Sequence, residues 1–427
     1  MFVAITNTPR PYAWGSTSAI AGLLGHTPSG GPEAELWLGA HPGSPSQIVD
    51  PSAVGGARTI AEWIEADPQT ALGRFASSKR LPFLLKILAA AHPLSLQAHP
   101  NPEQALAGFE RENALGIPLD APHRNYRDAS AKPELIYALS DTFDALCGFR
   151  PLGEVRALLE LLLDLDAATE EPQPQPLEDL LAQLASDDAL PQTFEWLISS
   201  GAGVPTLVSL VMRLAPLSAE PSLAVAAALA AEYPDDPGIV ISLLLNRVTL
   251  ARGEALYLPA GNIHAYLDGL GVELMAASDN VLRGGLTPKH IDVPELLGVL
   301  DFTPVPVPYL RAEGAGPTTE PQQDALTPSA SDDGLTPGPA AAPASGIEVF
   351  RPDVADFVLV RVSGADLDAG YALTGPGIAI CTAGELWIGG AASSVALGRG
   401  ESVYITPDEG RLSFSGNGEL FLATTGE

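Results

Sequence analysis

The sequence contains little cysteine, lysine and histidine, and few basic residues of any kind. Of 427 residues, 2 are Cys and 7 are His, and Lys and Arg together number 22 against 52 Asp and Glu. The net charge of −30 argues against general binding of nucleic acid or anionic membranes, because both need a basic surface. Cys147 and Cys381 lie far apart, which excludes a disulfide framework and favours a reducing compartment.

Targeting segments and long apolar runs are also missing. Residues 1–10 lack the basic and then apolar pattern of a signal peptide. The longest run of Ala, Leu and Val, residues 223–231, is shorter than the ~18 residues that span a membrane. We therefore expect a cytoplasmic protein, whose 46% of apolar residues can form a sizeable core.

The pattern of apolar residues changes along the chain and predicts a mainly β protein with an α-helical insertion. Short apolar stretches broken by turns indicate β domains, leucines with a period of 3.6 indicate helices, and a Pro-rich stretch without aromatic residues indicates disorder. The predicted parts are a catalytic β domain (1–150 plus 235–311), a helical subdomain (151–234), a disordered linker (312–346) and a C-terminal β domain (347–427).

Several local elements follow from the same patterns. We predict helices near residues 59–65, 102–114 and 293–300. We predict strands at residues 81–88, 94–99 and 239–245.

The most specific motif lies at residues 253–264. Its skeleton is Gly253, five residues, Pro259, one residue, Gly261, two residues and His264. Pro cannot donate to a strand ladder and Gly tolerates a positive φ, so the motif predicts a strand, a tight turn and a second strand. The spacing resembles the second metal motif of the cupin jelly rolls. The alternative is a hairpin whose histidine only caps the turn.

Gln97 and His99 form a second candidate pair of metal ligands. Residues two apart on a strand point to the same face, so both side chains can approach one ion. Leu94 and Leu96 alternate before them, and Pro100 follows at once. A buried strand would not usually place a polar pair there without a ligand, because buried polar groups need partners.

Lys132 and Glu134 flank Pro133, which keeps the segment extended. The carboxylate suits a metal ligand, and the ammonium suits a phosphate or an oxyanion. Taken alone, the pair is better explained as a surface ion pair that contributes little.

Together, four side chains supply two imidazole nitrogens and two oxygens to a predicted metal site. They are Gln97, His99, Glu134 and His264. Such a set suits one Zn²⁺ most simply, with Mn, Co or Fe as alternatives.

Residues 271–290 concentrate charge in a chain that is otherwise poor in it. Glu273 falls in a predicted strand, the next turn is predicted to expose Arg283, and Lys289 follows. Such a cluster indicates a functional site. A solvated loop would explain Asp279, but it fits Glu273 and Arg283 poorly.

With these motifs in view, the sequence resembles the type I phosphomannose isomerases of the cupin superfamily. The matching stretches occur in the family order over residues 12–289. They are Tyr12-Ala-Trp-Gly-Ser16, Glu35-Leu-Trp-Leu-Gly-Ala-His-Pro42, Leu84-Leu-Lys86, Gln97-Ala-His-Pro-Asn101, Lys132-Pro-Glu134, Ala145-Leu-Cys-Gly-Phe-Arg150, Pro259-Ala-Gly-Asn-Ile-His-Ala-Tyr266 and Ser278-Asp-Asn-Val-Leu-Arg-Gly-Gly-Leu-Thr-Pro-Lys289.

The resemblance implies a cupin jelly-roll catalytic domain and a second, metal-free cupin-like β domain. No histidine follows His290, so the second domain cannot repeat a histidine-based site. It also implies one zinc per chain on the four ligands above, with Arg283 as the active-site arginine. The other residues that it places around the cavity are Trp14, Glu35, Lys86, Lys132, Tyr266, Glu273 and Lys289.

The implied reaction is the reversible conversion of mannose 6-phosphate to fructose 6-phosphate through a cis-enediol. It needs a base, stabilisation of an oxyanion and a grip on the phosphate. We predict Glu273 as the base, because burial beside a metal site can raise its pKa; a hydroxide held by the zinc is the rival base. Lys132 and Arg283 are predicted to stabilise the enediolate or assist ring opening, and Lys86 and Lys289 to contact the phosphate.

One departure from the family concerns Ser130 and Ala131, where members often have Asn-His. Proton transfer by that histidine does not apply to this chain. Two other functions stay open: a cupin oxygenase, which would more typically carry His at both 97 and 99, and a non-catalytic, metal-containing sugar-phosphate-binding protein.

We expect a phosphorylated hexose as the ligand, and no nucleic acid or membrane partner. A monomer is expected, with a weak homo-oligomer as the alternative. Mannose catabolism and GDP-mannose biosynthesis are both compatible with the implied reaction.

Overall fold

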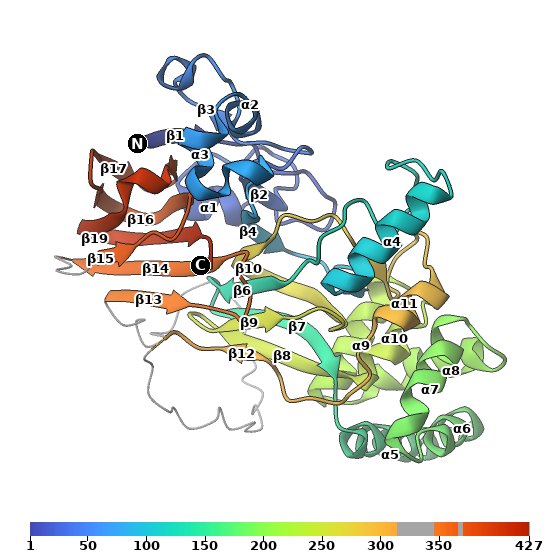
Figure 1. Cartoon of the computed structure of the whole chain (residues 1–427). Coiled ribbons are helices and arrows are strands. Elements are labelled where there is room, and N and C mark those ends of the chain that lie inside the picture. The colour runs from blue at the N-terminus through green and yellow to red at the C-terminus, as the bar shows by residue number, and fades with distance from the viewer. Residues whose placement is uncertain (314–345, 366–369, 427) are drawn as a thin grey trace.

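The computed structural model describes residues 1–313, 346–365 and 370–426. Two large antiparallel sheets and a group of helices make up the fold (Figure 1). The predicted mainly β architecture with helices is therefore confirmed in outline. Nearly all of the linker predicted at 312–346 lies outside the described residues.

A ten-stranded sheet carries the candidate site. Its main path runs through β11 (Leu282–Arg283), β5 (Gln97–Ala98), β10 (His264–Ala276), β6 (Glu134–Ala138), β9 (Ala255–Leu258) and β12 (Tyr309–Leu310). The strands that join it off this path are β2 (Glu35–Leu38), β4 (Phe83–Ala90), β7 (Thr142–Phe149) and β8 (Leu245–Ala251).

Strand β10 connects two parts of this sheet. Residues 264–268 pair with β5 and β7, whereas residues 269–276 pair with β4 and β6. Gly269, at the junction, has φ of 128°, which a residue with a Cβ rarely adopts. One strand therefore carries His264 in its first part and Glu273 in its second.

A nine-stranded sheet contains the C-terminal strands and the first strand of the chain. Its strands are β13 (Gly346–Phe350), β14 (Val358–Ala365), β19 (Arg411–Thr424), β16 (Gly377–Gly389), β18 (Ser402–Ile405), β1 (Phe2–Thr6), β3 (Gln47–Ile48), β15 (Gly370–Ala372) and β17 (Ser394–Gly398). Val3 lies opposite Tyr404, and Figure 1 shows β1 beside the red C-terminal strands. The division of the chain into domains stays a prediction, and this pairing joins its first and last parts.

Both faces of β4 are buried. Phe83 and Leu85 share a hydrophobic cluster with residues of β14, β16 and β19, whereas Leu88 belongs to a different cluster that contains Tyr266. A strand that is buried on both faces has a nearly continuous apolar sequence, as residues 81–88 do. Lys86 is the single charged side chain in that run.

The helices occupy two groups of sequence positions. Those between the strands of the first 150 residues are α1 (Ala19–Leu24), α2 (Ile60–Ala66), α3 (Pro68–Leu72) and α4 (Pro102–Ala114). Those that follow, mostly in the lower right of Figure 1, are α5 (Leu152–Ala167), α6 (Gln175–Gln183), α7 (Leu190–Ile198), α8 (Val204–Leu214), α9 (Pro221–Glu232), α10 (Gly238–Ile241) and α11 (Val293–Val299).

Two of the predicted strands differ in the structure. Residues 239–245 form the short helix α10 and a 3-10 turn (Ser242–Leu244) before β8 begins. A short apolar run that is buried on every side has no readable period, so sequence does not separate helix from strand. The side chain of Asp236 accepts the backbone N–H of Gly238 at 2.7 Å, which favours the helical turn. Of residues 94–99, β5 includes only Gln97–Ala98.

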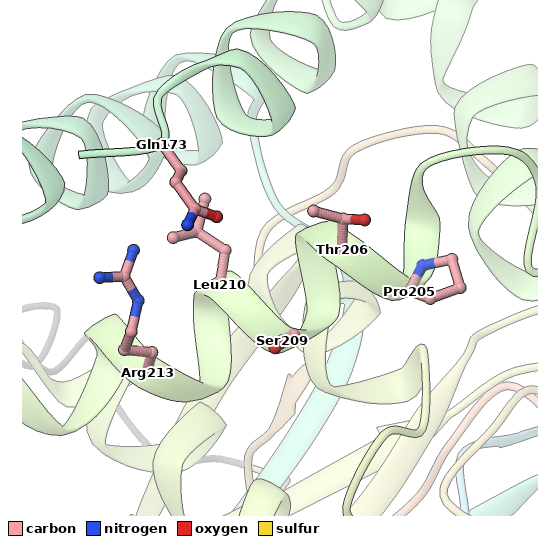
Figure 2. A pocket seen from close by; sticks show the side chains of 6 residues that line it. All are labelled: Gln173, Pro205, Thr206, Ser209, Leu210 and Arg213. Atoms are coloured by element: carbon pink, nitrogen blue, oxygen red, sulfur yellow. The ribbon is translucent and has the colours of Figure 1, made fainter. Parts of the chain in front are cut away.

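No helix in the described ranges is long and apolar enough to cross a membrane. A hollow of about 460 Å³ lies along α8, and none of the predicted site residues lines it (Figure 2). Its lining residues are Gln173, Pro205, Thr206, Ser209, Leu210 and Arg213.

Candidate functional site

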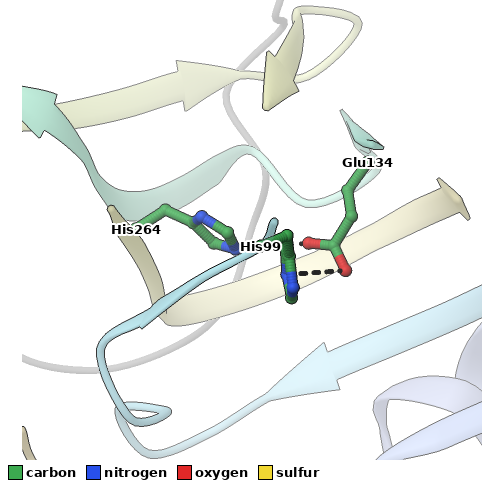
Figure 3. Close-up of side chains that lie close together, drawn as sticks. All are labelled: His99, Glu134 and His264. Atoms are coloured by element: carbon green, nitrogen blue, oxygen red, sulfur yellow. Dashed lines mark ion pairs between the residues drawn. The ribbon is translucent and has the colours of Figure 1, made fainter. Parts of the chain in front are cut away.

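Three buried side chains meet where the strands of the ten-stranded sheet begin or end. His99 directly follows β5, Glu134 begins β6 and His264 begins β10. One ligand atom of each lies within 4.8 Å of the others, although the residues come from distant parts of the sequence (Figure 3). The structure therefore brings together three of the four predicted metal ligands.

Backbone carbonyls fix the orientation of both imidazole rings. His99 donates from Nδ1 to the carbonyl of Asn280 at 2.7 Å, and His264 donates from Nδ1 to the carbonyl of Asn262 at 3.0 Å. These bonds place the proton on Nδ1 and turn the Nε2 lone pairs towards Glu134. Burial lowers the pKa of His99 to about 4, so this ring is neutral near pH 7.

The atoms that face one another in this group are all acceptors. His99 Nε2 lies 3.3 Å from Glu134 Oε1, and His264 Nε2 lies 3.2 Å from Glu134 Oε2. Within the described residues, both Nε2 atoms and Glu134 Oε2 lack a hydrogen-bond partner. Buried acceptors without a donor are costly. Two atoms bound about 2.1 Å from a tetrahedral zinc lie roughly 3.4 Å apart, so the spacing fits a divalent cation.

Lys132 lies against this group. Its Nζ is 3.0 Å from Glu134 Oε1. Burial alone would raise the pKa of Glu134, but the neighbouring ammonium outweighs burial and holds this pKa well below its usual range. Glu134 is therefore negatively charged at neutral pH.

Gln97 lies between two other residues of the predicted site. On β5 it is directly opposite His264 of β10 on one side and Arg283 of β11 on the other. Directly opposite residues of antiparallel strands share a face, so the three side chains lie in one row. Arg283 is half-buried on a short strand, whereas the sequence predicted an exposed turn.

A second buried cluster centres on Lys86. Its Nζ lies 2.8 Å from Glu273 Oε2 and 3.3 Å from Glu35 Oε1, and all three side chains are less than 10% exposed. The centre of the Trp37 ring lies 5.2 Å from Lys86 Nζ, and Trp37 donates from Nε1 to Glu35 Oε2 at 2.9 Å. The cluster thus pairs one cation with two carboxylates.

Burial and charge shift the ionisation of this cluster. Burial alone would lower the pKa of Lys86, but Glu273 and Glu35 outweigh it and raise this pKa above its usual value. Burial also raises the pKa of Glu273, although Lys86 opposes the shift. Glu273 therefore binds a proton more readily than an exposed glutamate does.

Tyr266 lies between the two clusters. Its ring centre is 6.2 Å from that of His264, and burial, with Glu273 nearby, raises its pKa well above the usual value. Its hydroxyl has no hydrogen-bond partner within the described part of the chain. Trp14 is partly buried and packs against the hydrophobic cluster that contains Tyr266. A protonated hydroxyl is thus available beside the His99–Glu134–His264 group.

Known proteins share this arrangement of the whole chain. The family profile "Phosphomannose isomerase type I, catalytic domain" matches residues 2–152. The mannose-6-phosphate isomerase of Escherichia coli (strain K12) is 34% identical over 424 residues, which cover 97% of each chain. The human mannose-6-phosphate isomerase is 37% identical over 321 residues, which cover 69% of this chain and 72% of the human one.

This chain belongs to the type I phosphomannose isomerase family. A crystal structure of zinc-bound mannose 6-phosphate isomerase supports the assignment, with a TM-score of 0.82, 32% identity and 99% of both chains covered.

Sequence reasoning within the family stretches missed residues that the structure places at the site. Trp37 and Asn280 both lie inside those stretches, yet neither was selected. The spacing of two between Glu35 and Trp37 on one strand was a usable signal, because it puts both on the same face. Lys289, which was predicted as a site residue, is exposed overall. Partial burial of its ammonium and the neighbouring Arg283 both lower its pKa.

Proposed function

We propose that this chain interconverts mannose 6-phosphate and fructose 6-phosphate, with one zinc ion held by Gln97, His99, Glu134 and His264. The observation that carries the proposal is that, among the described residues, three buried acceptor atoms of the His99–Glu134–His264 group have no hydrogen-bond partner, in a member of the phosphomannose isomerase family. When bound, zinc would polarise the oxygens on C1 and C2 of the sugar.

We further propose that the ten-stranded sheet forms a cupin jelly roll and that residues 347–427, which supply most of the nine-stranded sheet, form a second, metal-free cupin-like domain. The motif at residues 253–264 and the passage of β10 between two parts of the sheet support the first assignment. The absence of histidine after residue 290 supports the second.

In this proposal, Glu273 is the catalytic base. Its carboxylate takes the proton from C2 of the open-chain aldose and returns it to C1, while a hydroxyl proton moves from O2 to O1, which gives the ketose. A raised pKa suits this role, because a base transfers protons best when its pKa approaches the working pH. Lys86 holds this carboxylate in place.

Cationic groups stabilise the remaining charges. Lys132, which contacts Glu134, and Arg283, which lies opposite Gln97, are assigned to the enediolate oxygens or to ring opening. Lys289 is assigned to the phosphate, because its ammonium is exposed. Lys86 is the weaker phosphate contact, because two carboxylates already engage it.

Conversion of mannose 6-phosphate in deuterated water tests this function. We expect fructose 6-phosphate to form, with deuterium at C1 when the base exchanges its proton with solvent. Mannose without phosphate serves as the control, and we expect a much higher KM for it. A zinc-loaded chain that binds mannose 6-phosphate without converting it would instead be a sugar-phosphate-binding protein.

A further inference from the structure

Asn280 is a fully buried residue in the loop between β10 and β11. Its Oδ1 accepts the backbone N–H groups of Arg127 at 2.7 Å and of Asp128 at 3.2 Å. Its Nδ2 donates to the backbone carbonyls of Asp128 at 2.7 Å and of Ser130 at 2.9 Å. The amide thus uses its full hydrogen-bonding capacity on one short segment.

The same residue also contacts a predicted metal ligand. Its own carbonyl accepts the Nδ1 proton of His99 at 2.7 Å. The segment that its side chain holds, residues 127–130, leads directly into Lys132 and Glu134. Asn280 therefore connects, through one side chain and one carbonyl, two ligands that are 35 residues apart in sequence (134 − 99).

Neighbouring residues strengthen the connection between the two segments. The Ser278 hydroxyl donates to the carboxylate of Asp128 at 3.0 Å, and the Asp279 N–H donates to the same carboxylate at 2.9 Å. Asp279 also pairs with Nε2 of His41 at 3.0 Å. The loop and the segment before Glu134 are therefore held as one unit, with Asn280 at its centre.

We propose that Asn280 is a positioning residue of the metal centre, which sets the ring orientation of His99 and the path of the chain that delivers Glu134. The inference rests on the proposed function, because it presumes that the His99–Glu134–His264 group binds zinc. Groups that orient metal ligands typically change metal affinity 10- to 100-fold when they are removed.

The dissociation constant for zinc, measured by competition with a chromophoric chelator, tests the proposal without an activity assay. Asn280→Asp keeps the shape and both acceptor bonds, but it places an oxygen against the carbonyls of Asp128 and Ser130. Asn280→Ala removes all four bonds. We expect both substitutions to raise the dissociation constant by about 10- to 100-fold.

A matched control separates positioning from general stability. Asp166 is also fully buried and holds a loop, since it accepts the N–H of Gln173 at 2.6 Å and the side chain of Arg213 at 2.9 Å. It lies in the helical region, on α5. Asp166→Ala should lower the thermal unfolding midpoint of the metal-free protein and leave the zinc dissociation constant unchanged.

Several outcomes decide the question. A dissociation constant for Asn280→Asp within twofold of wild type would overturn the inference, and so would an equal rise in Asp166→Ala. If neither Asn280 variant folds, Ser278→Ala takes their place, because it removes the hydroxyl that accepts the Asn280 N–H at 3.2 Å. This substitution should also raise the zinc dissociation constant, and an unchanged constant would contradict the proposal. A wild-type chain that binds no zinc would instead refute the proposed function.

Discussion

Two buried polar clusters lie side by side in the ten-stranded sheet, and they differ in one respect. The cluster of Glu35, Lys86 and Glu273 contains its own cation, which contacts both carboxylates. In the cluster of His99, Glu134 and His264, Lys132 contacts only Glu134 Oε1, and within the described residues both Nε2 atoms and Glu134 Oε2 have no hydrogen-bond partner. The chain therefore completes the first cluster by itself and leaves the second for a ligand.

The difference between the two clusters has a physical cause. An ammonium between two carboxylates offsets the cost of burying them, and it also keeps Glu273 in one position. With the ring proton on Nδ1, an imidazole cannot donate from the Nε2 atom that faces Glu134. Burial without full compensation thus supports the proposed cation site, and compensated burial supports the proposed position of the base.

The largest expected effect comes from Glu134→Gln. The substitution removes the anionic ligand, so we expect zinc affinity and turnover to fall by more than the roughly 100-fold that is typical of an indirect change. The new amide can donate to a facing Nε2 atom, because these atoms lie 3.2–3.3 Å from the carboxylate oxygens.

Glu134→Gln also tests the stability of the metal-free protein. The variant gains an amide donor for a facing Nε2 atom but loses the charge that pairs with Lys132, so its unfolding temperature, measured by calorimetry with chelator present, should fall less than that of metal-free Lys86→Met. An equal or larger fall would mean that the acceptors of the wild type were not in conflict.

Glu273→Gln should reduce kcat by about 10²- to 10⁴-fold, the usual contribution of a general base. Zinc content, measured by atomic absorption, should not change, because Glu273 is not among the proposed ligands. Near-wild-type turnover would show that another group removes the proton.

The pH profile of the wild type provides an independent measure of the same residue. The base must be ionised, so kcat/KM should fall as pH decreases through the pKa of Glu273, which burial raises above the usual range for glutamate. In Glu273→Gln this acidic limb should disappear from the residual activity.

Lys86→Met should have its main effect on stability. It leaves Glu35 and Glu273 buried without their cation, and breaking a buried ion pair costs about 3–5 kcal/mol. We expect a lower midpoint in urea denaturation, with zinc binding retained. Lys86→Arg, which keeps the charge, is the control and should recover most of the loss.

Tyr266→Phe should have the smallest effect. Within the described residues the buried hydroxyl has no hydrogen-bond partner, so its removal should leave the free energy of unfolding unchanged or raise it by up to about 1 kcal/mol. If the hydroxyl donates to the sugar, KM should rise by about 2- to 10-fold, the contribution of one neutral hydrogen bond. A clear loss of stability in Tyr266→Phe would mean that the hydroxyl has a structural partner.

Sequence patterns were sufficient where one physical signal dominated. The leucine period predicted helices where α5 to α9 occur, and Asn101-Pro102 predicted the start of α4. The turn at Pro259 and Gly261 placed His264 at the start of a strand, as the structure has it. Local rules of backbone geometry decide these features.

The remaining features depend on contacts between distant segments. Residues 239–245 form an apolar run interrupted only by Ser242, so their period does not separate helix from strand. Packing, together with the hydrogen bond from Gly238 to Asp236, selects the helical turn. No local sequence pattern predicts that β1 pairs with β18, which lies some 400 residues away. Lys86 stood out in an apolar run, yet its two carboxylate partners are visible only after β2, β4 and β10 pair.

The most direct test of the central claim is the removal and return of zinc. Purified protein is treated with a chelator, dialysed and assayed for conversion of mannose 6-phosphate to fructose 6-phosphate before and after stoichiometric zinc is added. We predict that activity is lost with the metal and returns with one zinc per chain, while Glu134→Gln stays inactive throughout. Full activity in the metal-free protein, or no zinc binding at all, would contradict the account.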